Sequence, residues 1–226
     1  MKNKRILFFS DLEGTILRDS DGKFDEKDFN NLVGELSKMG DLTKSTVEIR
    51  LVSPIGFKRM DKIVDKMDSI ISKYFMKARK ISNVKLVEAV ASPYDIADDI
   101  SASRRISRKI TPLPHVTYSP DIAREAKRRY LKYVFESFKE PSNIALSIYA
   151  GNDRNDIDAM LIVKKEKNGF TVCPKNSIAQ IKEISDFVSD ENDILGVIEG
   201  VSKINKKIEK RILAQERKIE DDKEIE

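Results

Sequence analysis

Two carboxylates near the start of the chain, Asp11 and Glu13, follow directly after an apolar segment that spans residues 6–9. A continuous apolar segment of this kind is typical of a strand that is buried on both faces of a sheet. In open α/β sheets the ligand crevice lies outside the carboxyl ends of the strands, so we expect both carboxylates to border a crevice. Gly14 allows the chain to turn away sharply and leaves Asp11 unobstructed. Carboxylates placed in this way are positioned for chemistry.

Two further predicted strands end in polar residues. The strand over residues 47–52 ends at Ser53, and the apolar segment 144–150 ends at a polar turn with the sequence Gly151-Asn152-Asp153-Arg154-Asn155-Asp156. Our central expectation is that the tips near positions 11, 53 and 152 meet around one cation-sized hollow that an ammonium group faces.

The pattern along the chain alternates between strands and helices. Apolar spacings of three and four predict helices over residues 29–36 and 57–75 and a helix that opens at Ser119-Pro120. The first of these helices should stop at Gly40. Short apolar segments predict further strands over residues 84–90 and 170–174. This alternation predicts an α/β fold with a mainly parallel, Rossmann-like sheet and helices on both faces. The predicted core comprises residues 1–90 and 119–200.

Two segments lie outside this predicted core. Residues 91–118 have no clean period and contain three prolines, so we interpret them as a reduced cap or an irregular insert. Residues 201–226 form a predicted charged C-terminal helix with a stripe of Ile204, Ile208 and Ile212, and its end should fray. The stripe could serve association with a second copy, although packing onto its own domain is the more ordinary explanation.

Composition narrows the function classes. The chain has 226 residues with 42 basic and 38 acidic side chains, a net charge of +4 that does not favour a nucleic-acid or membrane partner. The single cysteine excludes an internal disulfide, and no apolar segment approaches the ~20 residues of a membrane span. Because the first residues lead directly into a strand without a signal-peptide pattern, we expect a cytoplasmic protein.

Taken together, the motifs resemble the haloacid dehalogenase (HAD) superfamily of phosphatases. The similar features are Asp-Leu-Glu-Gly-Thr after a buried strand, a strand that ends in Ser53, an upstream lysine and the polar turn after residue 150. The branch that looks closest contains Cof-like and archaeal phosphoglycolate-phosphatase-like enzymes, which carry a stretch similar to residues 169–176 and 184–189. The resemblance covers roughly residues 5–53 and 120–200 and implies a HAD-type core.

The resemblance implies a magnesium-dependent phosphoric monoester hydrolase. Asp11 would be the nucleophile that forms an aspartyl-phosphate, and Ser53 would hydrogen-bond a phosphate oxygen. The Glu13 side chain would be the general acid, and its backbone carbonyl a metal ligand. A phosphomonoester dianion repels a carboxylate, so such a site needs a divalent cation and a positive side chain. Mg²⁺ suits these oxygen ligands.

The positive side chain has two candidates on one predicted helix. The family places its lysine at a helix start with apolar residues three, four, seven and eleven positions later. Residues 130, 131, 134 and 138 match that register for Lys127. Lys132 is the competitor, and both could instead be solvated lysines on a basic helix.

The implied metal ligands depart from the family pattern at one position. Asn152 stands where the family usually has aspartate, and a neutral amide oxygen is a poorer Mg²⁺ ligand than a carboxylate. Asp153 could substitute if the loop shifts, and Asp156 matches an acidic position of the family motif. A structural alternative is a turn that merely caps the following helix.

The sequence therefore favours a magnesium-dependent phosphatase acting on a sugar phosphate or a phosphoglycolate-like phosphomonoester. A reduced cap would leave the site open to bulky phosphorylated substrates, or to a lid from a neighbouring subunit in a homo-oligomer. The alternative is a catalytically weakened HAD-like domain that acts as a binding or assembly module. A phosphomutase is a weaker third reading, because mutases need a more elaborate cap.

Overall fold

The computed structural model describes residues 4–92, 110–112, 120–138 and 141–224. Most of the segment predicted to be a reduced cap or irregular insert, residues 91–118, therefore lies outside the described residues. Within it, the end of one strand and a short strand at the edge of the sheet are described.

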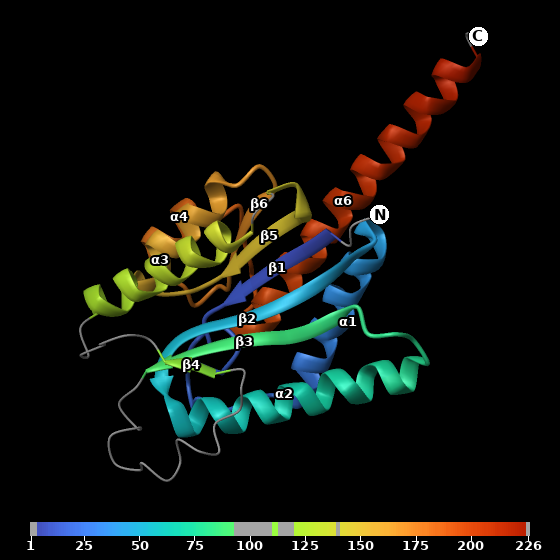
Figure 1. Ribbon diagram of the computed structural model, residues 1–226. Coiled ribbons are helices and arrows are strands. Elements are labelled where there is room, and N and C mark those ends of the chain that lie inside the picture. The colour runs from blue at the N-terminus through green and yellow to red at the C-terminus, as the bar shows by residue number, and fades with distance from the viewer. Residues whose placement is uncertain (1–3, 93–109, 113–119, 139–140, 225–226) are drawn as a thin grey trace.

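The described strands form one seven-stranded sheet with the order β4-β3-β2-β1-β5-β6-β7 (Figure 1). All neighbouring strands are parallel. The strands are β1 (Lys4–Ser10), β2 (Ser45–Gly56), β3 (Val84–Ser92), β4 (Ile110–Pro112), β5 (Ile144–Ala150), β6 (Gly169–Cys173) and β7 (Phe187–Val188). The predicted mainly parallel α/β sheet is thereby confirmed.

Helices cover both faces of the sheet, as predicted (Figure 1). Three long helices pack on one face: α1 (Glu26–Thr43), α2 (Phe57–Ala78) and α6 (Asp193–Glu224). The opposite face carries α3 (Pro120–Ser137), α4 (Ile157–Lys165) and α5 (Ala179–Ile184). Two short 3-10 helices, η3 (Pro141–Asn143) and η4 (Arg154–Asp156), flank β5.

The central strand β1 is apolar on both sides because both sides are covered. Ile6 and Phe8 belong to the core beneath α1 and α2, whereas Leu7 and Phe9 belong to the core beneath α3 and α4. All four side chains are almost completely buried. Continuous burial of this kind explains why the strand does not alternate between apolar and polar residues.

Helix α1 shows how local signals set an element's ends. The Asp25 side chain accepts hydrogen bonds from the backbone of Lys27 and Asp28 at the start of the helix. The sequence suggested a stop at Gly40, but the helix continues to Thr43 and is capped by Lys44, which has a φ of 52°. Gly40 is needed for close packing instead, because a Cβ there would lie 2.9 Å from the Ser45 carbonyl oxygen.

Helix α6 begins at Asp193, before the boundary expected at residue 201, and its far half extends away from the body of the molecule (Figure 1). Ile204 is fully buried, and Ile208 packs against the same core cluster. These two members of the isoleucine stripe thus pack onto their own domain. Among the described residues, no helix is both long enough and apolar enough to cross a membrane.

Candidate functional site

Asp11 lies at the carboxyl end of the central strand and is 3% exposed. Its backbone N–H donates to the Ala150 carbonyl at 3.0 Å, which joins the tips of β1 and β5. The Ser10 hydroxyl donates to the Asp11 carbonyl at 2.7 Å. Burial raises the pKa of Asp11 from 3.8 to about 7; nearby Lys127 opposes this rise and Asp156 adds to it. The position therefore favours a cation beside this carboxylate.

Lys127 on α3 supplies one such cation. Its side chain is fully buried, and Nζ lies 3.1 Å from Asp11 Oδ1. The ammonium also donates to Asp156 Oδ1 and Asn155 Oδ1, each at 2.7 Å. Burial alone would lower the pKa of Lys127, but the carboxylates of Asp11 and Asp156 outweigh it and raise the pKa above its ordinary value. Lys132, the competing candidate, is exposed.

Asp156 anchors this arrangement. Its Oδ1 accepts hydrogen bonds from Lys127 and from the Tyr149 hydroxyl, the latter at 2.8 Å. Its Oδ2 accepts from the backbone N–H groups of Asn152 and Asp153, each at 3.1 Å. A carboxylate has about four acceptor positions, and these four donors occupy them. The geometry therefore favours Asp156 as a support for Lys127 and for the turn rather than as a ligand of a free cation.

Asn152 faces the turn that follows Asp11. Its Oδ1 accepts a hydrogen bond from the Thr15 hydroxyl at 3.1 Å. Gly14 lies so close that a Cβ there would come within 2.1 Å of Asn152 Nδ2, and its φ is 65°. Only glycine adopts this conformation readily in so little space. The Asp153 side chain instead accepts from the Arg154 N–H at 2.6 Å and caps η4.

Ser53 and Glu13 have contrasting surroundings. Ser53 on β2 is fully buried, and its Oγ has no hydrogen-bond partner among the described residues. Such an orphaned buried hydroxyl suits a ligand oxygen, because buried polar groups are normally paired. The Glu13 side chain is 53% exposed, and its Oε1 lies 3.0 Å from Nη1 of Arg59 on α2. Arg59 also donates to the Gly22 carbonyl at 3.0 Å.

The structure brings Asp11, Lys127, Asn155 and Asp156 into one network and places Asn152 against the turn after Asp11. Sequence reasoning did not single out Tyr149 or Arg59. Tyr149 is the one tyrosine of the apolar segment 144–150 and stands two positions before the polar turn. A phenolic hydroxyl at the end of a buried strand was an available signal for a hydrogen bond to the turn. Arg59 had none, because its contact with Glu13 joins residues 46 positions apart.

The donor set is compatible with a hard cation such as Mg²⁺. Asp11 offers a carboxylate, Asn152 offers an amide oxygen, and the Glu13 carbonyl lies on the same turn; Mg²⁺ prefers oxygen ligands and keeps several waters. In the described part of the chain, no cluster of three or more His, Cys, Asp or Glu side chains could hold a metal ion. A cation here would therefore depend on backbone, amide and substrate oxygens as well as on Asp11.

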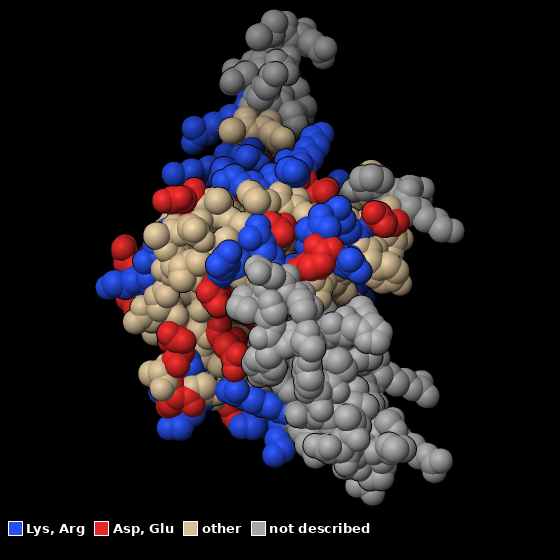
Figure 2. Space-filling view, turned by 90° about the vertical axis from the view of Figure 1, so that its left-hand side faces the viewer, with Lys and Arg blue, Asp and Glu red and all other residues tan. Residues whose placement is uncertain are grey.

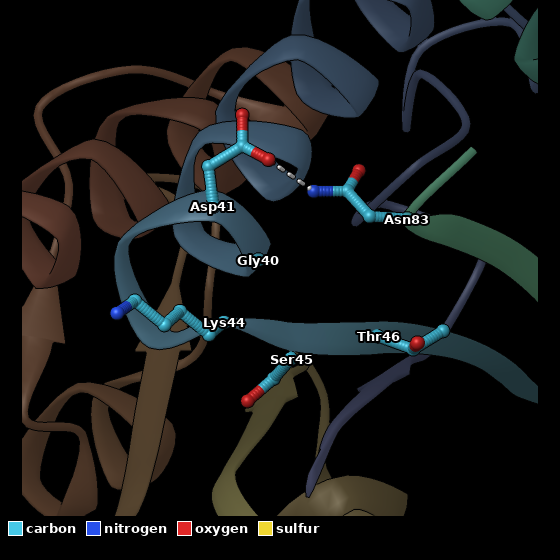
Figure 3. Close-up of a pocket in the computed structure, with 6 residues that line it drawn as sticks. All are labelled: Gly40, Asp41, Lys44, Ser45, Thr46 and Asn83. Atoms are coloured by element: carbon cyan, nitrogen blue, oxygen red, sulfur yellow. Dashed lines mark hydrogen bonds between the residues drawn. The ribbon is translucent and has the colours of Figure 1, made fainter. Parts of the chain in front are cut away.

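The visible part of the face at the carboxyl ends of the strands mixes acidic and basic side chains (Figure 2). The opposite end of the sheet contains a pocket of about 350 Å³, lined by Gly40, Asp41, Lys44, Ser45, Thr46 and Asn83 (Figure 3). There the Asn83 side-chain amide donates to Asp41 Oδ1 at 2.8 Å. Because this pocket lies at the start of β2, it is remote in the fold from the strand tip that carries Asp11.

Comparisons with known proteins give structural likenesses only. No family model matches the chain, and no curated protein matches it. A haloacid dehalogenase-like hydrolase from Bacteroides thetaiotaomicron is 11% identical, with a TM-score of 0.48, and the match covers 90% of this chain and 100% of that one. A haloacid dehalogenase-like hydrolase protein from Bacillus subtilis is 13% identical, with a TM-score of 0.47 and 90% of each chain covered.

A third similar structure is the cobalt-bound form of deoxy-D-mannose-octulosonate 8-phosphate phosphatase from Haemophilus influenzae. It is 11% identical, with a TM-score of 0.44, and the match covers 92% of this chain and 89% of that one. Since these TM-scores all lie below 0.5, the similar structures carry no argument about the function of this protein.

Proposed function

We propose that the protein is a magnesium-dependent phosphatase that hydrolyses a phosphomonoester, such as a sugar phosphate or a phosphoglycolate-like compound, through an aspartyl-phosphate on Asp11. The observation that carries the proposal is the pairing of the buried Asp11 carboxylate with the fully buried ammonium of Lys127 at the carboxyl end of the central strand. Burial of two opposite charges is costly, and ligands of open α/β sheets bind outside the carboxyl ends of the strands, so a buried pair at this position favours a catalytic use.

Each residue has a chemical task in this proposal. Asp11 attacks phosphorus, and the ester oxygen leaves with a proton from the Glu13 carboxyl group. Water then attacks the aspartyl-phosphate with Glu13 as the base, which regenerates Asp11. Lys127 stabilises negative charge near Asp11 throughout, and the Ser53 hydroxyl donates to a phosphate oxygen.

The proposed cation ligands are Asp11, the Glu13 backbone carbonyl and Asn152. When bound, Mg²⁺ supplies positive charge that offsets the repulsion between Asp11 and an incoming phosphate dianion. Asp156 and Asp153, which the sequence also suggested as ligands, already accept hydrogen bonds from the chain itself. We therefore assign them the tasks of holding Lys127 and capping η4.

A panel of phosphomonoesters assayed for inorganic phosphate, with and without Mg²⁺, tests the proposal. The wild-type protein should release phosphate only with the metal, and its acid-quenched form should carry phosphate on Asp11. Asp11→Asn should be inactive although it preserves the shape of the side chain. Undiminished hydrolysis by Asp11→Asn would remove the nucleophile from the mechanism.

One observation favours the alternative of a weakened domain that binds phosphorylated ligands without turnover. The Asn152 amide is neutral, and its Oδ1 already accepts from Thr15. If this limits metal binding, Asn152→Asp should bind Mg²⁺ more tightly and hydrolyse faster. Equal Mg²⁺ affinity in titrations of both proteins would count against Asn152 as a ligand.

A further inference from the structure

Asn176 contacts the turn after Asp11 and helps to enclose it. Its side-chain amide donates to the Gly14 carbonyl at 3.0 Å, a contact between residues 162 positions apart. A Cβ at Gly14 would lie 2.1 Å from Asn152 Nδ2 and 3.3 Å from Asn176 Nδ2. The turn is therefore closely packed against two asparagine side chains, of which Asn152 is a proposed cation ligand.

Asp193, the first residue of α6, holds Asn176 in place. The Asn176 amide donates to Asp193 Oδ1 at 2.9 Å, and the Asp193 backbone N–H donates back to Asn176 Oδ1 at 2.9 Å. Asp193 Oδ1 also accepts from the Asp19 N–H at 3.1 Å. Asp193 has a φ of 49°, a strained conformation for a residue other than glycine. The paired hydrogen bonds stabilise that conformation and orient the amide toward Gly14.

We propose that Asn176 is a positioning residue for phosphoryl transfer. Its amide fixes the Gly14 carbonyl and thereby the turn of residues 13–15, which carries the general acid Glu13 at one end. At the other end, the Thr15 hydroxyl donates to Asn152 Oδ1. The inference rests on the proposed phosphatase function. A misplacement of about 1 Å in such a turn can cost about 100-fold in rate, so a single donor at this point controls turnover.

The hydrogen bonds suggest an exchange of side chains that separates the contact of residue 176 with residue 193 from its contact with Gly14. In the double variant Asn176→Asp with Asp193→Asn, the side-chain amide at 193 can donate to the carboxylate at 176. The backbone N–H of residue 193 keeps its acceptor, but the Asp19 N–H loses its own, because it shares Asp193 Oδ1 with the Asn176 amide in the wild type. The donor to the Gly14 carbonyl is lost as well, because an ionised aspartate has no N–H.

Steady-state kinetics with p-nitrophenyl phosphate and Mg²⁺ should compare wild type, Asn176→Ala and the exchanged pair, with thermal unfolding measured in parallel. We expect Asn176→Ala to lose kcat by about 10- to 100-fold while KM changes by less than about 3-fold. The exchanged pair restores the bond between positions 176 and 193 but not the donor to Gly14, so it should keep the low kcat. Recovery of wild-type kcat together with stability would overturn the proposal.

Amide hydrogen exchange of the turn gives a readout that does not need activity. The backbone N–H groups of Thr15, Ile16 and Leu17 all donate to the Leu12 carbonyl in the wild type. They should exchange faster in both Asn176 variants, and unchanged exchange would refute the positioning role. A wild type without phosphatase activity would refute the proposed function, while the exchange rates would still decide whether Asn176 holds the turn.

Discussion

Asp156→Asn should be among the most damaging small substitutions in the protein, although it changes neither the size nor the shape of the side chain. The wild-type carboxylate accepts from Lys127, Tyr149 and the N–H groups of Asn152 and Asp153. In asparagine an NH2 group replaces one of the two oxygens. Two of the four donors then face another donor and lose their acceptor. The fully buried ammonium also loses one of its two carboxylate partners.

The magnitude follows from the burial of these groups. Leaving a buried donor unsatisfied costs about 1–3 kcal/mol, and breaking a buried ion pair costs about 3–5 kcal/mol. Asp11 still balances the charge of Lys127, and some donors can reorient toward other acceptors. We therefore expect the free energy of unfolding to fall by about 3–5 kcal/mol in total. That is a large part of a typical stability of about 5–15 kcal/mol.

Urea unfolding at neutral pH measures this loss as a lower midpoint with an unchanged slope. Asp158→Asn is a matched control, because Asp158 lies two residues away and pairs with Arg124 at 2.6 Å in a partly exposed position. Removing that pair should cost about 1 kcal/mol or less. If Asp156→Asn is no more destabilising than the control, the buried network does not have the energetic role assigned here.

Three further predictions concern the same site. Without Mg²⁺, Asp11→Asn should gain stability relative to wild type as pH rises from about 4 to about 7. The raised pKa of Asp11 means that the native state binds the proton of Asp11 more tightly than the unfolded state does. The free energy of unfolding of the wild type therefore falls by up to about 4 kcal/mol across that window. A difference between the two proteins in urea unfolding that does not change with pH would contradict this. Lys127→Met should lower kcat on p-nitrophenyl phosphate at least 100-fold and destabilise the fold by about 3–5 kcal/mol, since two carboxylates lose their buried cation. A variant that keeps its kcat and its stability in urea unfolding would remove Lys127 from the mechanism. Gly14→Ala should lower both the unfolding midpoint and kcat, because the φ of 65° at Gly14 and the 2.1 Å approach of Asn152 leave no room for a methyl group. Gly34→Ala is the control, because the nearest atom to a Cβ there lies 3.6 Å away. A smaller effect of Gly14→Ala than of Gly34→Ala would refute the steric argument.

The elements of the core were predictable from local sequence. The apolar segments of β1 and β5 and the three-and-four spacing along α2 indicate their structures directly, because burial on one or two faces imposes a period on neighbouring residues. The ends of these elements were less predictable from the sequence. Helix α1 continues beyond Gly40, which the sequence suggested as its stop, because that glycine serves packing rather than termination.

The sequence by itself determined the parallel α/β core and the location of Asp11 at a strand tip, since strand ends and acidic turns are recorded in consecutive residues. Only the tertiary structure decided which groups meet there. It buries Lys127 and exposes Lys132 on the same helix, joins Glu13 to Arg59, and brings Asn176 to Gly14. Contacts of this kind link residues far apart in the chain. They depend on how whole helices pack on the sheet, and no local pattern of residues encodes that packing.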